Sequence, residues 1–472
     1  MRLRISGFLF LLLPLAVLIA QSPRIPKEAQ VGYQSITEND LSARLHFIAS
    51  PELEGREATF RGQKVAARYI GSEFQRLGLK PIGDGGSYFQ RFSVEVTRPS
   101  DESKITVSNK QGEKNFFFRK DYVTLSAQDT VLSGPVVFIG YMDARPDSML
   151  IKGKVVLALA GRKQDSEDPN IPAMRRILLL RQFSGSIATL IVADDTGSGS
   201  VEMLLSRFGS MVEKGLMRPI GIEARGRLMF QSPILISPGV AEEILAETGR
   251  SVSEMRRVAA QDTAFQPMLL GQTSVRVKSQ VSKEMKETEN VVGLLEGSDP
   301  KLRDQVVVFS AHYDHLGVNS DGTVFPGADD DGSGTVTVLE LAEAFVTNPI
   351  KPKRSLVFLT VTGEEKGLWG SQLRVSNKAT ENLTLDYKYN SDKDPEQFYR
   401  RSDHYNFARN GIPIVFFFTG VHKDYHRPTD TVDKILFDRM TKIVRLIYYT
   451  GWNVANFKTK LAKNVESTEY SK

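Results

Sequence analysis

The sequence predicts an α/β protein whose central sheet, mostly parallel or mixed, carries helices on both faces. Short apolar runs rich in β-branched residues, such as residues 306–309 and 355–361, have the length of buried strands. Amphipathic stretches of helix length, such as residues 335–346, lie between them. Strands that alternate with helices usually form a largely parallel sheet that is covered on both sides.

The N-terminal part of the chain contains two predicted helices. Thr37-Glu38-Asn39-Asp40 resembles a capping box, which predicts a helix that begins there and continues to Ile48. A second amphipathic helix is predicted over residues 63–77, and Gly78 supplies its stop signal. Strand-like segments follow at residues 89–96 and 104–107.

Residues 125–261 differ from the flanking sequence in their pattern of strand candidates, and we predict that they form a β-rich inserted domain. This block holds four strand candidates and a final helix, at residues 134–140, 153–159, 189–193, 233–237 and 239–248. It contains no histidine and no cluster of metal ligands, so we expect a scaffold or lid role. The main domain is then discontinuous, over residues 21–124 and 262–457, and a polar tail at 458–472 is expected to be flexible.

The main domain resumes with four strand candidates, at residues 290–295, 306–309, 355–361 and 412–418. A helix is expected at 335–346 and a closing helix at 437–452. Because polar residues follow three of these strands directly, the sequence places the chemistry at strand ends.

The first twenty residues predict an export signal. Arg2 and Arg4 precede an apolar run that continues to Ala20, as in a signal peptide cleaved near Ala20-Gln21. An uncleaved anchor is the alternative. The absence of cysteine excludes a lipoprotein anchor, disulfides and a thiol nucleophile. We therefore expect a bacterial protein that is secreted or periplasmic, with no stable membrane association after cleavage.

Length and charge limit the remaining possibilities. A chain of 472 residues is long enough for two or three domains. Its formal net charge of +5 is small for that length, and its basic residues are scattered, so no nucleic-acid partner is predicted. The oligomeric state cannot be predicted from these features.

The stretch from Ser310 to Gly334 carries the strongest chemical signal. His312, Asp314 and His315 follow a predicted strand, and Asp329-Asp330-Asp331 precedes the next helix. Imidazoles and carboxylates at a strand end indicate a metal site. The run DDDGSG alone would be more typical of a solvated turn or a helix N-cap.

A pair of adjacent glutamates, Glu364 and Glu365, follows the next strand. Neighbouring side chains diverge, so one can bind a metal while the other faces a metal-bound water as a general base. Taken alone, the pair is as consistent with a solvated loop. Five of the six histidines lie between residues 312 and 426, which favours the metal site.

Five ordered motifs together resemble the zinc-dependent M28 peptidases of the aminopeptidase Y and S group: SAHYDHLG, PGADDDGSG, TGEEKGLWGS, YRRSDHYNFA and DYHRPTDTVDKI. The resemblance implies a zinc exopeptidase (phosphorylase/hydrolase-like) fold, aminopeptidase activity on peptides or proteins, and two zinc ions. In the inserted block, KGKVVLA, LIVADD and ILISPGVAEEIL resemble a protease-associated (PA) domain.

The resemblance also assigns roles to individual residues. His312 matches a ligand of the first zinc, Asp330 the carboxylate that bridges both zincs, and Glu365 and His426 the ligands of the second. Glu364 matches the general base, Tyr425 the group that stabilises the oxyanion, and Asp314 a residue that orients a ligand. His315 and Ser402-Asp403-His404 match positions near the site, and their roles stay open. A cis peptide is expected between Asp330 and Asp331.

The sequence departs from the family in one respect. The family has an N-x-D-M-x-G element between the GEE and SDH motifs, and its aspartate completes the first zinc site. Here a strand–helix unit is missing between Ser371 and Asp386, and Asp386 is the candidate substitute. Two alternatives therefore stay open beside the aminopeptidase: a single-zinc enzyme like the glutaminyl cyclases, and an inactive PA-bearing binding protein. The sheet is also expected to lack a strand.

Overall fold

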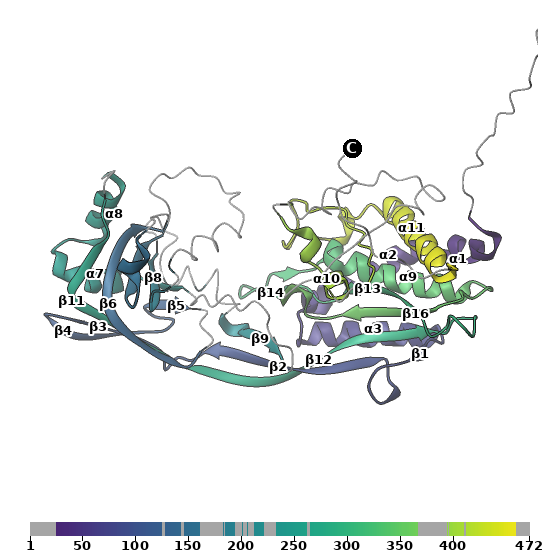
Figure 1. Cartoon of the computed structure of the whole chain (residues 1–472), viewed down its shortest axis with the longest axis horizontal. Coiled ribbons are helices and arrows are strands. Elements are labelled where there is room, and N and C mark those ends of the chain that lie inside the picture. The colour runs from purple at the N-terminus through teal and green to yellow at the C-terminus, as the bar shows by residue number, and fades with distance from the viewer. Residues whose placement is uncertain are drawn as a thin grey trace, which may run out of the picture.

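The computed structural model describes residues 25–124, 128–142, 146–160, 183, 185–193, 201, 205, 212–220, 233–261, 265–366, 394, 396–409 and 412–458. The predicted signal peptide, Asp386 and residues 459–472 of the tail lie outside these residues. The described chain forms two lobes, each built on its own sheet and joined by long strands (Figure 1). None of the described helices has the length and apolar character needed to cross a membrane.

The first sheet is mixed, as predicted. Its strands follow the order β13 (Val306–His312), β16 (Ser355–Val361), β12 (Val281–Leu295), β2 (Phe89–Pro99) and β9 (Leu216–Pro219), with β1 (Lys80–Pro81) beside β12. β13 and β16 are parallel, with His312 opposite Val361. The other pairings in this sheet are antiparallel, so parallel pairing in its described part is limited to the two strands that carry the site.

The predicted helices are present. Thr37 caps α2 (Glu38–Ile48), because its hydroxyl accepts a hydrogen bond from the Asp40 amide at 3.1 Å. The other helices predicted for this domain are α3 (Arg61–Arg76), α9 (Gly334–Thr347) and α11 (Phe437–Asn456), whereas α1 (Gln30–Ser35) and α10 (His404–Arg409) were not predicted. The core between helices and sheet is aromatic: the Phe345 ring of α9 lies 6.3 Å from Phe358 of β16.

The helices α3, α9 and α11 pack against one face of this sheet. A Cβ added at Gly293 of β12 would lie 3.1 Å from Phe74 of α3, and Gly293 pairs with Phe358, whose ring faces α9. On the opposite face Val306 and Val308 are 49% and 39% exposed. Within the described part of the chain, these three helices therefore share one face of the sheet.

The strand predicted at residues 412–418 is also wrong. These residues form no ladder with another strand. Phe416 stacks on Phe418 at 5.2 Å and on His404 at 4.0 Å, so the apolar run packs against α10. A strand needs a neighbour that satisfies its backbone, and β13 pairs with one strand, β16, in the described structure.

The second sheet forms the other lobe. Its order is β4 (Gly112–Phe117), β3 (Lys104–Asn109), β11 (Met268–Ser279), β6 (Thr130–Tyr141), β7 (Val155–Leu159), β8 (Ala188–Val192), β10 (Ile234–Ile236) and β5 (Tyr122–Thr124). The short helix α4 (Ser148–Ile151) and the helices α7 (Pro238–Leu245) and α8 (Val252–Gln261) accompany it. The sheet draws strands from both sides of residues 125–261, while the domain boundaries stay a prediction.

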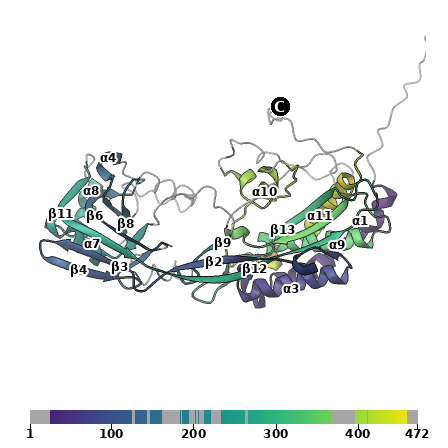
Figure 2. The same cartoon turned by 60° about the horizontal axis from the view of Figure 1, so that its bottom comes forward.

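The inserted block also contacts the first lobe. Its strand β9 pairs with β2, and the turned view shows β2 and β12 running from one lobe to the other (Figure 2). Lys214, just before β9, lies 2.5 Å from the buried carboxylate of Glu57. The same ammonium donates to the Leu316 carbonyl at 3.2 Å, beside the loop that carries the predicted ligands.

Candidate metal centre

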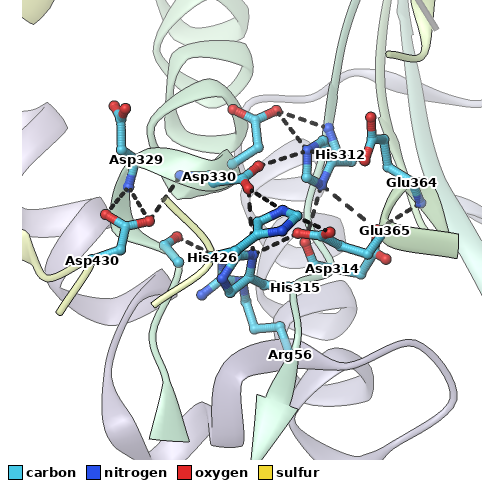
Figure 3. A network of polar contacts seen from close by, with 12 residues as sticks. Arg56, His312, Asp314, His315, Asp329, Asp330, Glu364, Glu365, His426 and Asp430 are labelled. Carbon is cyan, nitrogen blue, oxygen red and sulfur yellow. Dashed lines mark hydrogen bonds and ion pairs between the residues drawn. The ribbon is translucent and has the colours of Figure 1, made fainter. Parts of the chain in front are cut away.

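The predicted site residues converge at the ends of the parallel strands β13 and β16 (Figure 3). His312 is the last residue of β13, and Glu364 and Glu365 follow β16. The turn before α9 supplies Asp330, and the loop before α11 supplies His426. Because these strands are adjacent and parallel, their ends bring residues distant in sequence to one point.

Asp330 lies between two imidazoles. Its Oδ1 is 3.3 Å from His312 Nε2, and its Oδ2 is 3.1 Å from His426 Nε2. A carboxylate with one oxygen directed at each histidine has the arrangement of a bridge between two metal ions. The peptide between Asp330 and Asp331 is cis, as predicted.

The two adjacent glutamates diverge. Glu365 is held by two histidines, at 3.2 Å from His426 Nε2 and 2.7 Å from His315 Nδ1. The Oε2 atom of Glu364 is 3.8 Å from His312 Nε2. The pair is therefore divided as the sequence predicts, with one carboxylate among the ligand candidates and the other beside them.

Asp314 supports both sides of the centre. Its backbone carbonyl accepts a hydrogen bond from His312 Nδ1 at 3.0 Å, which leaves Nε2 directed at Asp330. Its buried carboxylate accepts the Glu364 amide at 3.3 Å. These contacts match the orienting role that the family resemblance implies for Asp314.

Burial and neighbouring charges divide the carboxylates into two kinds. Burial alone would raise the pKa of Asp330, but the neighbouring His312 and His426 imidazoles outweigh it and lower that pKa. For Glu365, burial also acts to raise the pKa, yet His315 and His426 lower it to about 2. Burial raises the pKa of Glu364 to about 7. The two ligand candidates are thus ionised, while Glu364 can exchange a proton near neutral pH.

Asp430 was not among the predicted site residues, yet it holds the turn that carries Asp330. Its buried carboxylate accepts the Asp329 amide at 3.0 Å and the Asp330 amide at 3.2 Å. In the sequence, Asp430 lies within the motif DYHRPTDTVDKI, but no local pattern there indicates a contact with a residue 100 positions earlier.

Arg56 was also not predicted as a site residue, and its side chain links the loops that carry the site. The side chain is fully buried and donates to the carbonyls of Tyr313 at 2.8 Å, Pro326 at 2.6 Å and Gly327 at 2.9 Å. It also donates to Ile48 O at 2.7 Å. One guanidinium thus joins the loop after β13 to the turn before α9, a contact between segments that no local pattern reveals.

Three predicted site residues remain: Tyr425, Asp403 and Asp386. The Tyr425 ring stacks on His426 at 3.9 Å, and burial raises the pKa of its phenol, with Asp330 and Glu365 nearby. Burial raises the pKa of Asp403 well above its usual range, and the nearby Glu364 adds to this. Asp386 lies outside the described residues, so its role as a substitute ligand stays a prediction.

The donor set suits zinc. Several buried atoms of this cluster have no hydrogen bond within the described structure: Asp330 Oδ2, Glu365 Oε1 and both ring nitrogens of His315. One ligand atom from each of these three residues lies within 4.8 Å of the others. Buried carboxylate and imidazole atoms without partners are costly unless an ion compensates them, and zinc accepts both ligand types.

The comparisons with known proteins agree with this chemistry. The model of peptidase family M28 matches residues 290–393 and 376–451. Over these residues the chain is similar to peptidase family M28. The two matched pieces overlap over residues 376–393, near the place where a strand–helix unit is predicted to be missing, between Ser371 and Asp386.

Curated relatives that match part of this chain carry peptidase names. A probable zinc metalloprotease of Pyricularia oryzae is 32% identical over 179 residues, covering 37% of this chain and 33% of that protein. A probable leucine aminopeptidase of Arthroderma benhamiae is 26% identical over 231 residues, covering 36% of this chain and 65% of the relative. The chain thus spans between a third and two thirds of these relatives.

A solved aminopeptidase from Aneurinibacillus sp. strain AM-1 is similar over 93% of this chain and 98% of its own, with 18% identity and a TM-score of 0.49.

Proposed function

We propose that this protein is an exported zinc aminopeptidase that removes N-terminal residues from peptides. One observation carries the proposal: Asp330, Glu365 and His426 converge while Glu364 lies beside them with a pKa near neutrality. The names of the M28 relatives support zinc and the aminopeptidase reaction. The arginines and apolar run at the N-terminus support export to the periplasm or medium.

The residues present would hold zinc at two positions. Asp330, Glu365 and His426 would bind the second ion, since three protein ligands suffice for a catalytic zinc. His312 and Asp330 would bind the first, with Asp386 as a possible third ligand. When bound, zinc acts as a Lewis acid that polarises the scissile carbonyl and lowers the pKa of water.

The chain's own residues would then move the protons. Glu364 takes a proton from the attacking water and passes it to the departing amine as the C–N bond breaks. The Tyr425 hydroxyl donates a hydrogen bond to the developing oxyanion, and its raised pKa keeps it protonated at neutral pH. His312 stays oriented by the Asp314 carbonyl throughout.

Zinc analysis of the purified mature chain, paired with an assay on aminoacyl chromogenic substrates, tests the proposal. Two zinc ions with turnover support the two-metal aminopeptidase. One zinc with aminopeptidase turnover supports a single-zinc mechanism on the same residues, and cyclisation of N-terminal glutamine without hydrolysis supports the cyclase alternative. Absence of both zinc and turnover refutes the proposal and leaves the binding protein.

A further inference from the structure

His315 is fully buried and points into the metal centre from the loop after β13 (Figure 3). Its Nδ1 lies 2.7 Å from Glu365 Oε1 and 4.0 Å from Asp330 Oδ2. Its ring is 5.9 Å from that of His426 and nearly edge-on to it. His315 and His426 thus flank the same two carboxylates, which are the ligand candidates for the second zinc.

The position of the His315 ring is fixed by close packing. Its backbone amide donates to the Arg56 carbonyl at 3.2 Å. Gly327, at φ +58°, has no side chain where one would collide: an added Cβ would lie 2.4 Å from His315 Cγ. An imidazole held this firmly has little freedom to turn toward another partner.

Neither ring nitrogen of His315 makes a hydrogen bond in the described structure. Nδ1 and Glu365 Oε1 lie 2.7 Å apart as an ion-pair contact, and both atoms are buried without a hydrogen-bond partner. A buried imidazole without a hydrogen bond is costly. An ion placed between Nδ1 and the two carboxylates would compensate it.

The distances suit a shared ion. Ligand atoms around a tetrahedral zinc, with bonds of about 2.1 Å, lie about 3.4 Å apart. His426 Nε2 is 3.1 Å from Asp330 Oδ2 and 3.2 Å from Glu365 Oε2. His315 Nδ1 is 4.0 Å from the same Asp330 oxygen and 2.7 Å from the other Glu365 oxygen, Oε1, and these two distances lie on either side of 3.4 Å.

We propose that His315 Nδ1 is a fourth protein ligand of the zinc held by Asp330, Glu365 and His426. This inference rests on the proposed function, because it concerns the same zinc. Four protein ligands would strengthen zinc binding at the second metal position. The first position lacks the aspartate that the family usually supplies. Water would then join as a fifth ligand, a coordination number that catalytic zinc can reach.

Zinc binding measured directly tests the proposal without any assay of activity. In a His312→Ala background, which leaves the second position, X-ray absorption of the protein loaded with one equivalent of zinc counts the imidazoles. Two imidazoles per zinc are expected, from His315 and His426. One imidazole overturns the inference and leaves the proposed function intact, whereas failure of the parent protein to bind zinc overturns both.

Variants of His315 separate a ligand from a hydrogen-bond donor. Zinc affinity of His315→Ala and His315→Asn is expected to fall by roughly a hundredfold or more, beyond the usual effect of a residue that merely orients a ligand. Asn can offer an N–H near the position of Nδ1, so recovery of affinity in His315→Asn overturns the ligand assignment. The exposed His46 supplies the matched control, and His46→Asn should bind zinc like the parent. Far-UV circular dichroism confirms folding, and if both variants misfold, the imidazole count decides.

Discussion

Replacement of Glu364 by Gln removes one charge and leaves the shape of the side chain unchanged. Within the described structure, the Glu364 carboxylate pairs with His312, whose Nε2 lies 3.8 Å from Glu364 Oε2. The adjacent Glu365 instead lies 2.7 Å from His315 and 3.2 Å from His426. The substitution should therefore leave the ligand cluster in place and remove the group that accepts the proton.

The size of the effect follows from the role of Glu364. General-base catalysis contributes about 10²–10⁴-fold to a rate, which is about 3–5 kcal/mol in the activation barrier. We expect kcat of Glu364→Gln to fall by roughly that factor, with zinc content unchanged. Wild-type kcat/KM should rise with pH as Glu364 loses its proton. The midpoint of this rise should lie at or below the Glu364 pKa of about 7, because a bound cation lowers that pKa.

Initial rates on an aminoacyl chromogenic substrate, measured from pH 5 to 9 with about micromolar enzyme, test this together with zinc analysis. Glu365→Gln is the matched control: it makes the same chemical change one residue away and should lose zinc. A Glu364→Gln variant that keeps more than about a tenth of wild-type activity, or that loses zinc, refutes the assignment of the general base.

Three further changes test the framework around the site. Asp430→Ala leaves two buried amides without an acceptor, so unfolding free energy should fall by about 2–4 kcal/mol and zinc affinity should weaken, as followed by urea titration and metal competition. Arg56→Met removes donors to four buried carbonyls, and the loss should exceed about 3 kcal/mol in the same titration. His426, with a pKa raised to about 10 by Asp330 and Glu365 against the effect of burial, is protonated at pH 7 without metal, as is His312. Filling both positions should therefore release about two protons, and filling the second alone about one, in calorimetry with two buffers of different ionisation enthalpy.

Each of these predictions has a contradicting result. Asp430→Ala with unchanged stability and zinc affinity would show that the turn before α9 does not depend on that carboxylate. Arg56→Lys keeps the charge but not the planar fork, so recovery of stability in that variant would mean that charge alone matters. Zinc binding without proton release at pH 7 would show that the imidazoles are neutral before metal arrives.

Much of the site could be predicted because its chemistry follows strand ends. His312 and the Glu364-Glu365 pair follow short apolar runs, and such runs identify buried strands from local sequence alone. Parallel strands then bring their ends together whatever lies between them. The Thr37 cap was predictable for the same reason, since the whole interaction lies within four residues.

The failures have a common cause in pairing between distant segments. Residues 412–418 have the composition of a strand, yet a strand also needs a neighbour, and β13 has one described partner on its other side. The alternation of strands and helices also left open that the helices α3, α9 and α11 share one face of the sheet. Alternation along the chain does not specify the side on which each helix packs.

The amino-acid sequence by itself determined the residue types of the centre, the helices and strands that present them, and the divergence of two adjacent glutamate side chains. The tertiary structure decided which groups support them. Asp430 and Arg56 act on the Asp330 turn across 100 and more than 250 residues of chain. His315 faces the same carboxylates as His426 only because folding places two loops together. Contacts between distant segments depend on the packing of the whole domain, and short-range sequence patterns carry no record of them.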